Sequence, residues 1–238
     1  MTVLARLAAP LLCLGLVACT HAGGMPQSGE LKPGTAWVAG SPDWAAEARE
    51  VFAEATRYVD SREGALPDGG WYVVMDLDET LLNNVAYQVR LDRTGTSYSN
   101  DTWYEWTQEE AATAVPGSLE FVRHVVAAGG HVAFVTNRRD TEQLATEANL
   151  AKLGLVRGRD FRVLLTRASP DAPSSKEDRF ALVPDMLRVQ GYAYPVALAY
   201  VGDAKGDRPA ASDPEAFFCI DNGAMYGDPC AAVPLSGR

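Results

Sequence analysis

One short segment of the chain limits its fold more than any other. The segment is Val73-Val74-Met75-Asp76-Leu77-Asp78-Glu79-Thr80, an apolar stretch that runs into two carboxylates two positions apart. A continuous apolar run of this kind is typical of a strand buried on both faces. Because residues i and i+2 of a strand point to the same side, Asp76 and Asp78 leave the strand end together.

This pair of acids predicts a metal site. Two carboxylates held so close repel each other unless a cation or a shared proton relieves them. Oxygen ligands favour a hard cation such as Mg²⁺. The simpler alternative is a loop that carries two solvated acids.

Helices and strands alternate along most of the chain. Helical spacing and capping residues predict helices over residues 42–61, 116–128, 141–153 and 174–190. Apolar runs predict further strands over residues 131–136, 161–166, 195–201 and 217–220. Alternation of this kind implies right-handed crossovers. We therefore expect an α/β fold with a doubly wound parallel sheet, in one domain over residues 41–238.

An insertion interrupts this alternation after the first strand. Residues 83–115 are polar and aromatic and show no clean strand, which indicates a small cap over the strand end. Its aromatic residues are Tyr87, Tyr98, Trp103, Tyr104 and Trp106. Clustered aromatic rings can stack on a flat ligand, but most of them will pack the small core of the insertion itself.

The N-terminal residues predict a processing signal and an anchor. Residues 1–18 hold an apolar run too short to span a bilayer comfortably, as in a signal peptide. The run ends Leu16-Val17-Ala18-Cys19, which resembles the bacterial lipobox, and this resemblance implies lipidation of Cys19. An ordinary secretory signal is the alternative. We expect a lipid-anchored protein of the bacterial cell envelope, facing the periplasm or the surface from the outer membrane, with a flexible tether over residues 19–40.

Charge and cysteine content limit the partners. The net charge of −10 disfavours a nucleic acid polymer as a partner. An exported chain enters an oxidising compartment, where Cys219 and Cys230 either form a disulfide or remain two buried thiols. The oligomeric state stays open, a homo-oligomer included.

Polar residues follow the carboxyl ends of the predicted strands, where ligands bind in open α/β sheets. Besides Asp76 and Asp78 they are Thr136-Asn137 and Gly202-Asp203, with Asp207 four residues on and Lys176 at the start of a helix. Acids around a cation, a lysine, a hydroxyl and free backbone amides are what phosphoryl transfer requires. A carboxylate can act as the nucleophile in such a site.

These segments resemble the four motifs of the haloacid dehalogenase (HAD) superfamily in order and spacing. The segments are Asp76-Leu77-Asp78-Glu79-Thr80, Phe134-Val135-Thr136-Asn137-Arg138, Lys176 and Gly202-Asp203 with Asp207. Further stretches resemble the class C (subfamily IIIB) acid phosphatases, the lipoprotein 5'-nucleotidases of bacterial outer membranes. These stretches are Asn84 to Tyr87, Ala114-Val115-Pro116-Gly117 and Ala224-Met225-Tyr226-Gly227.

The resemblance implies a mechanism. Asp76 would attack phosphorus and form a phospho-aspartate, and Asp78 would protonate the leaving alkoxide and then activate water. Mg²⁺ would be bound by the carboxylates of Asp76 and Asp203 and by the backbone carbonyl of Asp78.

It also implies roles for residues that hold the substrate. Thr136 and the amide of Asn137 would bind phosphate oxygens, and Lys176 would neutralise charge. Asp207 would orient Lys176 or a metal-bound water. Tyr87 and Tyr226 match positions at which family members sandwich a nucleobase.

Each assignment has a structural alternative. Lys176 could be a surface residue, Thr136 a helix cap, Asp207 half of a solvated ion pair and Tyr226 a packing residue. The segment Ala204-Lys205-Gly206 departs from the more polar run of relatives, so that Lys205 could compete with Lys176.

We therefore predict a Mg²⁺-dependent phosphomonoesterase, of the acid phosphatase or 5'-nucleotidase type, that acts on nucleoside monophosphates or similar small phosphate esters. The alternative is a non-catalytic lipoprotein that binds a flat ligand on the same scaffold. A dehalogenase would have no use for Asp78.

Overall fold

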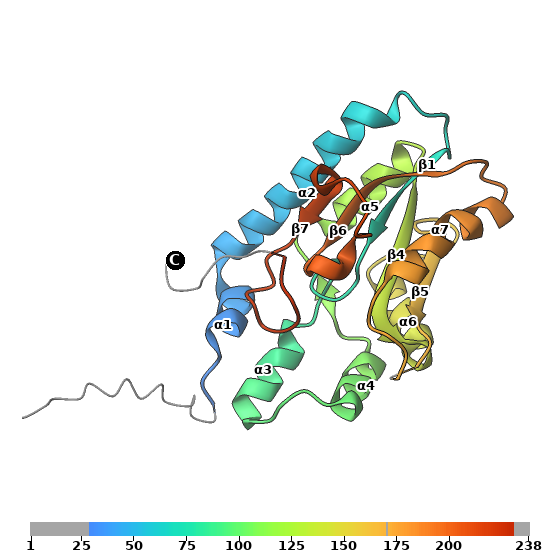
Figure 1. The fold of residues 1–238 in the computed structure, drawn as a ribbon. Helices are drawn as coiled ribbons and strands as arrows, with labels where there is room; N and C mark the ends of the chain where they lie inside the picture. Colours follow the sequence, from blue (N-terminus) through green and yellow to red (C-terminus); the bar gives the residue numbers. More distant parts are fainter. Residues whose placement is uncertain (1–28, 170, 231–238) are drawn as a thin grey trace, which may run out of the picture.

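A parallel five-stranded sheet forms the centre of the molecule (Figure 1). The computed structural model describes residues 29–169 and 171–230. The strands are β1 (Trp71–Met75), β4 (His131–Arg139), β5 (Val163–Arg167), β6 (Val196–Gly202) and β7 (Phe217–Cys219). Their order is β5-β4-β1-β6-β7, and each neighbouring pair is parallel. The predicted α/β fold is confirmed, with the strand that precedes Asp76 in the middle of the sheet.

Side chains of β1 alternate between two hydrophobic cores. Trp71, Val73 and Met75 belong to one core, whereas Tyr72 and Val74 belong to the other. Helices α2 (Pro42–Glu63), α5 (Ser118–Ala127) and α6 (Gln143–Lys152) contribute to the first core, and α7 (Glu177–Val189) covers the second (Figure 1). Burial on both faces explains why β1 reads as an uninterrupted apolar run.

Helix α2 begins as its sequence predicts. The Ser41 hydroxyl accepts hydrogen bonds from the backbone N–H groups of Asp43 and Trp44, and Pro42 occupies the first helical position. The buried residues of this helix recur at helical spacing, namely Trp44, Ala48, Phe52, Ala55 and Val59. They fix α2 across the first face of the sheet.

A short helix, α1 (Pro33–Gly40), precedes α2 and corrects one prediction. The tether expected over residues 19–40 is wrong for these last eight residues, which fold against the insertion. The backbone N–H of Lys32 donates to the Asp92 carboxylate at 2.9 Å, and its ammonium pairs with the same side chain. The Gly- and Pro-rich composition suggested flexibility. The contact that orders this segment was not predicted, because Asp92 lies 60 residues after Lys32 in the sequence. Cys19 and the signal lie outside the described residues.

The insertion is a helical pair on a small antiparallel base. Strands β2 (Leu82–Asn83) and β3 (Thr113–Ala114) pair at its root and bracket helices α3 (Val85–Thr94) and α4 (Asn100–Glu109). The Ser99 hydroxyl caps α4 by accepting from the Thr102 backbone N–H. Figure 1 shows both helices beyond the end of the sheet at which β1 terminates.

Short one-turn helices and a disulfide complete the fold. The 3-10 helices are η1 (Asp140–Glu142), η2 (Lys205–Asp207) and η3 (Pro214–Ala216). Cys219 and Cys230 form a disulfide, the first of the two states left open by the sequence. The Cys230 backbone N–H also donates to the Asp203 carbonyl at 2.9 Å, which holds the C-terminal segment beside the end of β6. Within residues 29–230 no helix is both long and apolar enough to cross a membrane.

The turn before β4 generates a stability prediction. A Cβ atom at Gly130 would lie 2.3 Å from the Trp71 ring, so Gly130→Ala forces the buried indole to move. Overpacking of this kind costs about 1–3 kcal/mol of unfolding free energy, measurable by chemical denaturation. Gly64→Ala is the matched control, because a Cβ there meets no atom within 4 Å. Equal stability of the two variants would contradict this packing.

Candidate active site

The candidate site lies at the carboxyl ends of three adjacent strands. Asp76 follows β1, Asp203 follows β6, and Thr136 lies in β4 two residues beyond the stretch paired with β1. The Asp76 backbone N–H continues the ladder by donating to the Val201 carbonyl at 3.0 Å. Because β1 lies between β4 and β6, the sheet order itself brings these residues to one place.

Lys176 is the centre of the buried charge cluster. Its Nζ lies 2.5 Å from Oδ1 of Asp76 and 2.6 Å from Oδ1 of Asp207. The residue is only 5% exposed, so it is not the surface lysine that the sequence left open. Burial opposes its charge, but the two carboxylates raise the pKa of Lys176 above its ordinary range.

Asp207 holds both the lysine and the loop that follows β6. Its Oδ1 pairs with Lys176, while its Oδ2 accepts the backbone N–H groups of Asp203 and Ala204 at 3.1 and 2.8 Å. A Cβ at Gly202 would lie 2.1 Å from the Asp207 Cβ, so only glycine leaves room for this arrangement. Asp207 therefore fixes the orientation of Lys176 and of the Asp203 backbone.

Asp203 has two polar partners that the sequence analysis did not identify. Thr80 Oγ1 donates to its Oδ1 at 3.3 Å, and Asn222 Nδ2 donates to its Oδ2 at 2.7 Å. The same Asn222 amide contacts the Tyr226 carbonyl at 3.3 Å. The position of Asn222, three residues after the end of β7, was the available signal, because it places the side chain at the same edge of the sheet.

The buried acids form a set that fits a divalent cation. Asp76, Asp203 and Asp207 each offer an oxygen, and these oxygens lie within 4.8 Å of one another. Burial above all raises the pKa of Asp76 to about 7 and that of Asp203 well above its ordinary value. Three carboxylates and one ammonium leave two negative charges when all are ionised, which a divalent ion would balance. The role of the Asp78 carbonyl as a ligand stays a prediction.

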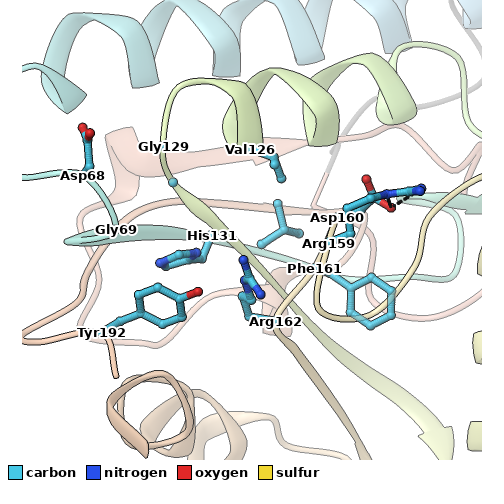
Figure 2. Close-up of a pocket in the computed structure, with 12 residues that line it drawn as sticks. Asp68, Gly69, Val126, Gly129, His131, Arg159, Asp160, Phe161, Arg162 and Tyr192 are labelled. Atoms are coloured by element: carbon cyan, nitrogen blue, oxygen red, sulfur yellow. Dashed lines mark hydrogen bonds and ion pairs between the residues drawn. The ribbon is translucent and has the colours of Figure 1, made fainter. Parts of the chain in front are cut away.

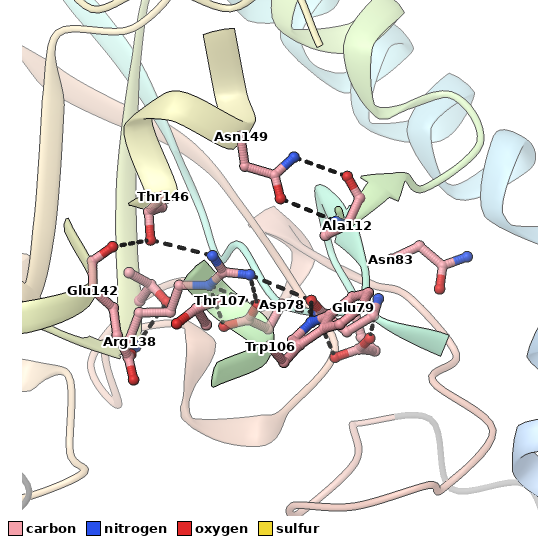
Figure 3. A network of polar contacts seen from close by, with 12 residues as sticks. Asp78, Glu79, Asn83, Trp106, Thr107, Ala112, Arg138, Glu142, Thr146 and Asn149 are labelled. Carbon is pink, nitrogen blue, oxygen red and sulfur yellow. Dashed lines mark hydrogen bonds and ion pairs between the residues drawn. The ribbon is translucent and has the colours of Figure 1, made fainter. Parts of the chain in front are cut away.

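Asp78 is bound on its side chain by Arg138, as Figure 3 shows. Arg138 Nε lies 2.9 and 3.2 Å from the two Asp78 oxygens, and its Nη2 lies 2.7 Å from Oδ1. The guanidinium is 1% exposed, whereas the Asp78 side chain is 15% exposed. Arg138 appeared in the sequence only as part of a motif, and its pairing with Asp78 was missed because 60 residues separate the two.

Arg179 organises the segment after β4. It donates to the Thr136 carbonyl and, at 2.6 Å, to Oδ1 of Asn137. Thr136 is fully buried, and its hydroxyl accepts the Arg138 backbone N–H at 3.1 Å. Asn137 is exposed at the strand end. The structure thus places both predicted phosphate-binding residues beside Asp76, on a segment that Arg179 holds.

The structure contradicts the expectation for Tyr87 and the alternative raised for Lys205. Tyr87 is 1% exposed, its hydroxyl hydrogen-bonds with that of Thr102, and its ring packs against Trp103 and Trp106, so no face is open to a base. The Tyr87 side chain points from α3 toward α4, and the spacing of aromatic residues in the sequence does not indicate this direction. Lys205 pairs with Asp228 at 2.8 Å on the surface and does not compete with Lys176.

Three other tyrosine rings are more exposed than Tyr87. Tyr98 and Tyr104 of the insertion are 58% and 41% exposed. Tyr226 is half-buried, and its hydroxyl has no partner among the described residues. Contact of Tyr226 with a flat ligand stays a prediction, and Tyr98 and Tyr104 are the exposed rings of the insertion.

A separate cavity lies at the opposite end of the sheet (Figure 2). It encloses about 320 Å³ and is lined by residues that include Gly69, His131 and Tyr192. His131 begins β4, whereas Thr136 lies toward the other end of this strand. The cavity is therefore distant from the acid cluster and is not part of the candidate active site.

Comparison with known proteins agrees with this geometry. The family model of HAD superfamily, subfamily IIIB (acid phosphatase), matches residues 29–229. Acid phosphatase 1 of Solanum lycopersicum is 30% identical over 157 residues, which cover 63% of this chain and 59% of the relative. The stem 28 kDa glycoprotein of Glycine max is 27% identical over 119 residues, which cover 50% of this chain and 46% of the relative. The chain thus spans roughly half of the length of these plant proteins.

A solved structure shows the same fold. The class C acid phosphatase of Bacillus anthracis superimposes with a TM-score of 0.68 at 23% identity, over 82% of this chain and 84% of that one. At this identity the likeness supports the fold alone, whereas the family model covers nearly all of the described residues. The chain therefore belongs to the HAD superfamily, subfamily IIIB, the acid phosphatase family that its motifs predict.

Proposed function

We propose that this protein is a Mg²⁺-dependent phosphomonoesterase that hydrolyses small phosphate esters through a phospho-aspartate. The observation that carries the proposal is the contact between Lys176 and Asp76 inside a buried cluster of acids. A lysine held against one carboxylate by a second carboxylate can neutralise a phosphoryl group that arrives at the first. Membership of the acid phosphatase family supports the same reaction.

The proposed reaction has two steps, formation of a phospho-aspartate and its hydrolysis. Asp76 would attack phosphorus, the bond from phosphorus to the ester oxygen would break, and Asp78 would give its proton to the leaving alkoxide. Asp78 would then take a proton from water, whose oxygen attacks phosphorus. The bond from phosphorus to the Asp76 oxygen would break, which releases inorganic phosphate and restores Asp76. Asp76 and Asp203 would hold Mg²⁺, which supplies charge neutralisation for the phosphoryl oxygens. Thr136, the Asn137 amide and Lys176 would orient these oxygens.

Nucleoside monophosphates are the proposed substrate class. An aromatic ring binds a base by stacking and tolerates different bases, so a broad specificity would follow. Tyr226 is the proposed stacking residue, because its backbone is tied through Asn222 to Asp203. The exposed rings of Tyr98 and Tyr104 offer a second surface on the insertion.

We propose the cell envelope as the site of this activity. Support comes from the lipobox-like Leu16-Val17-Ala18-Cys19 and from the disulfide between Cys219 and Cys230, which suits an oxidising compartment. A membrane would be contacted only through the lipid on Cys19. A phosphate ester carries charge that hinders uptake, so hydrolysis outside the inner membrane would release a nucleoside that can be recovered.

The competing reading is a non-catalytic lipoprotein that binds a flat ligand. The buried cluster argues against it, because three acids and a lysine in a protein interior destabilise the fold and serve no purpose in stacking. Hydrolysis of a nucleoside monophosphate with and without Mg²⁺ separates the two functions.

The metal assignment yields a prediction about Asp203→Asn. We expect Mg²⁺ affinity, measured by calorimetric titration, to fall at least about 10-fold, since loss of groups that merely support metal ligands has this effect. Without metal the variant should be at least as stable as wild type, because a buried carboxylate no longer repels Asp76 and Asp207. Asp43→Asn, on the exposed first turn of α2, is the control. Unchanged Mg²⁺ affinity would exclude Asp203 as a ligand.

The nucleophile assignment yields a prediction about Asp76→Asn. This variant should lose turnover of a nucleoside monophosphate by at least about 10³-fold, as expected when a nucleophile is removed. Its unfolding midpoint should stay near that of wild type, because Lys176 keeps its contact with Asp207. Steady-state kinetics and circular dichroism check both points, again with Asp43→Asn as control. Substantial activity in a folded Asp76→Asn protein would refute the phospho-aspartate route.

A further inference from the structure

We infer that the insertion positions the general acid, Asp78. Asn84, whose amide is oriented by a hydrogen bond from Trp106, donates together with Arg138 to Oδ1 of Asp78. Oδ2 is then the oxygen that carries the proton. The inference rests on the proposed function and assigns positioning roles to residues outside the metal and phosphate sites. Figure 3 shows Asp78, Arg138 and Trp106, which belong to the network that supports it.

The two oxygens of Asp78 have unequal surroundings. Oδ1 accepts from Arg138 Nη2 at 2.7 Å, from Arg138 Nε at 2.9 Å and from Asn84 Nδ2 at 3.0 Å. Oδ2 accepts only from Arg138 Nε, at 3.2 Å, among the described residues. An oxygen that already accepts three N–H groups has no room for a proton of its own. A proton on this carboxyl group therefore belongs on Oδ2.

Arg138 is fixed on several sides. Its Nη1 donates to the Thr146 hydroxyl on α6 at 3.2 Å, and Nη2 also approaches Oδ1 of Asn84 at 3.3 Å. Thr146 is itself held, because its hydroxyl donates to the Glu142 carbonyl at 2.8 Å. A fully buried guanidinium with this many partners cannot follow Asp78 to a new position without breaking them.

Asn84 connects this group to the insertion. It is fully buried at the start of α3, and its Oδ1 accepts the Trp106 indole N–H from α4 at 2.8 Å. Its backbone N–H and Nδ2 donate to the Glu79 carboxylate at 2.8 and 3.3 Å. Glu79 has a φ of 59°, a left-handed conformation that costs a non-glycine residue energy and that these bonds help to hold.

The indole bond determines which way the Asn84 amide points. Because Trp106 Nε1 can only donate, Oδ1 of Asn84 must face it, and Nδ2 then faces Asp78. The helices α3 and α4 thus control the orientation of the carboxyl group at the end of β1. Alternatively, these hydrogen bonds serve only to attach the insertion to the sheet. In that case their loss would affect the hydrolysis of all esters equally, whatever their leaving group.

The test compares two esters of similar size, benzyl phosphate and 4-nitrophenyl phosphate. The benzyl alkoxide must be protonated as it leaves, whereas the nitrophenolate is stable without a proton. The parameter is kcat/KM, which reports the steps up to departure of the leaving group and excludes the later attack of water. Asn84→Ala should lower kcat/KM for benzyl phosphate by about 10²-fold, the usual contribution of a general acid, and for 4-nitrophenyl phosphate by less than about 3-fold.

Asn149→Ala is the matched control. Asn149 is equally buried and ties the insertion to α6 through both backbone groups of Ala112, at 2.9 and 3.1 Å, without touching Asp78. It should change kcat/KM for the two esters by the same factor. Arg138→Lys keeps a positive charge but loses the bidentate contact of the guanidinium with Asp78, so it should show the same selective loss. It replaces Asn84→Ala in the test if Asn84→Ala does not fold.

Each outcome has one reading. Selective loss for benzyl phosphate in Asn84→Ala or Arg138→Lys supports the positioning role. Equal loss for both esters in these folded variants overturns it and leaves the phosphatase assignment intact. If the wild-type protein hydrolyses neither ester and no nucleoside monophosphate, the proposed function is overturned, and this inference with it.

Discussion

The contact of one buried lysine with two carboxylates is the interaction on which the site depends. Lys176 joins the start of α7 to Asp76 at the end of β1 and to Asp207 after β6, so that three separate segments meet at one ammonium group. Asp203 adds a further carboxylate to the same space. Groups of this kind are unfavourable in a protein interior unless they are paired. The three carboxylates carry more negative charge than the one ammonium group balances. We therefore expect a divalent cation to bind here.

The fold supplies this arrangement through its topology. A parallel sheet with β1 at its centre brings the ends of β4, β1 and β6 to the same edge, and apolar residues on both faces of β1 fix its position. The insertion covers that edge and reaches the site through Asn84, whose amide contacts Asp78 beside Arg138 of β4. The same edge thus holds two clusters of charged residues. In the proposed reaction the lysine cluster would bind the phosphoryl group, whereas the arginine network would orient the acid that protonates the leaving group.

The sequence patterns predicted the helices, the strands and the residues at the strand ends. Strand ends located Asp76, Thr136 and Asp203, and the apolar periodicity located the sheet and its helices, because burial imposes both patterns. The contacts of Arg138, Asn84 and Asn222 could not be predicted, since they join segments that are distant along the chain and leave no periodic signal. Tyr87 was misassigned for a related reason: an aromatic residue on a short helix packs a core or faces a ligand according to its neighbours. Residues 33–40 were misassigned because their partner, α3 (Val85–Thr94), is distant along the chain.

The location of a bound metal ion tests the account most directly. Crystals of the protein soaked in Mn²⁺, which substitutes for Mg²⁺ at oxygen sites and scatters anomalously, would show the ion without reference to any activity. The account predicts one strong anomalous peak in contact with carboxylate oxygens of both Asp76 and Asp203, with Lys176 still paired to Asp207. A peak elsewhere, or an ion that contacts neither Asp76 nor Asp203, would contradict it.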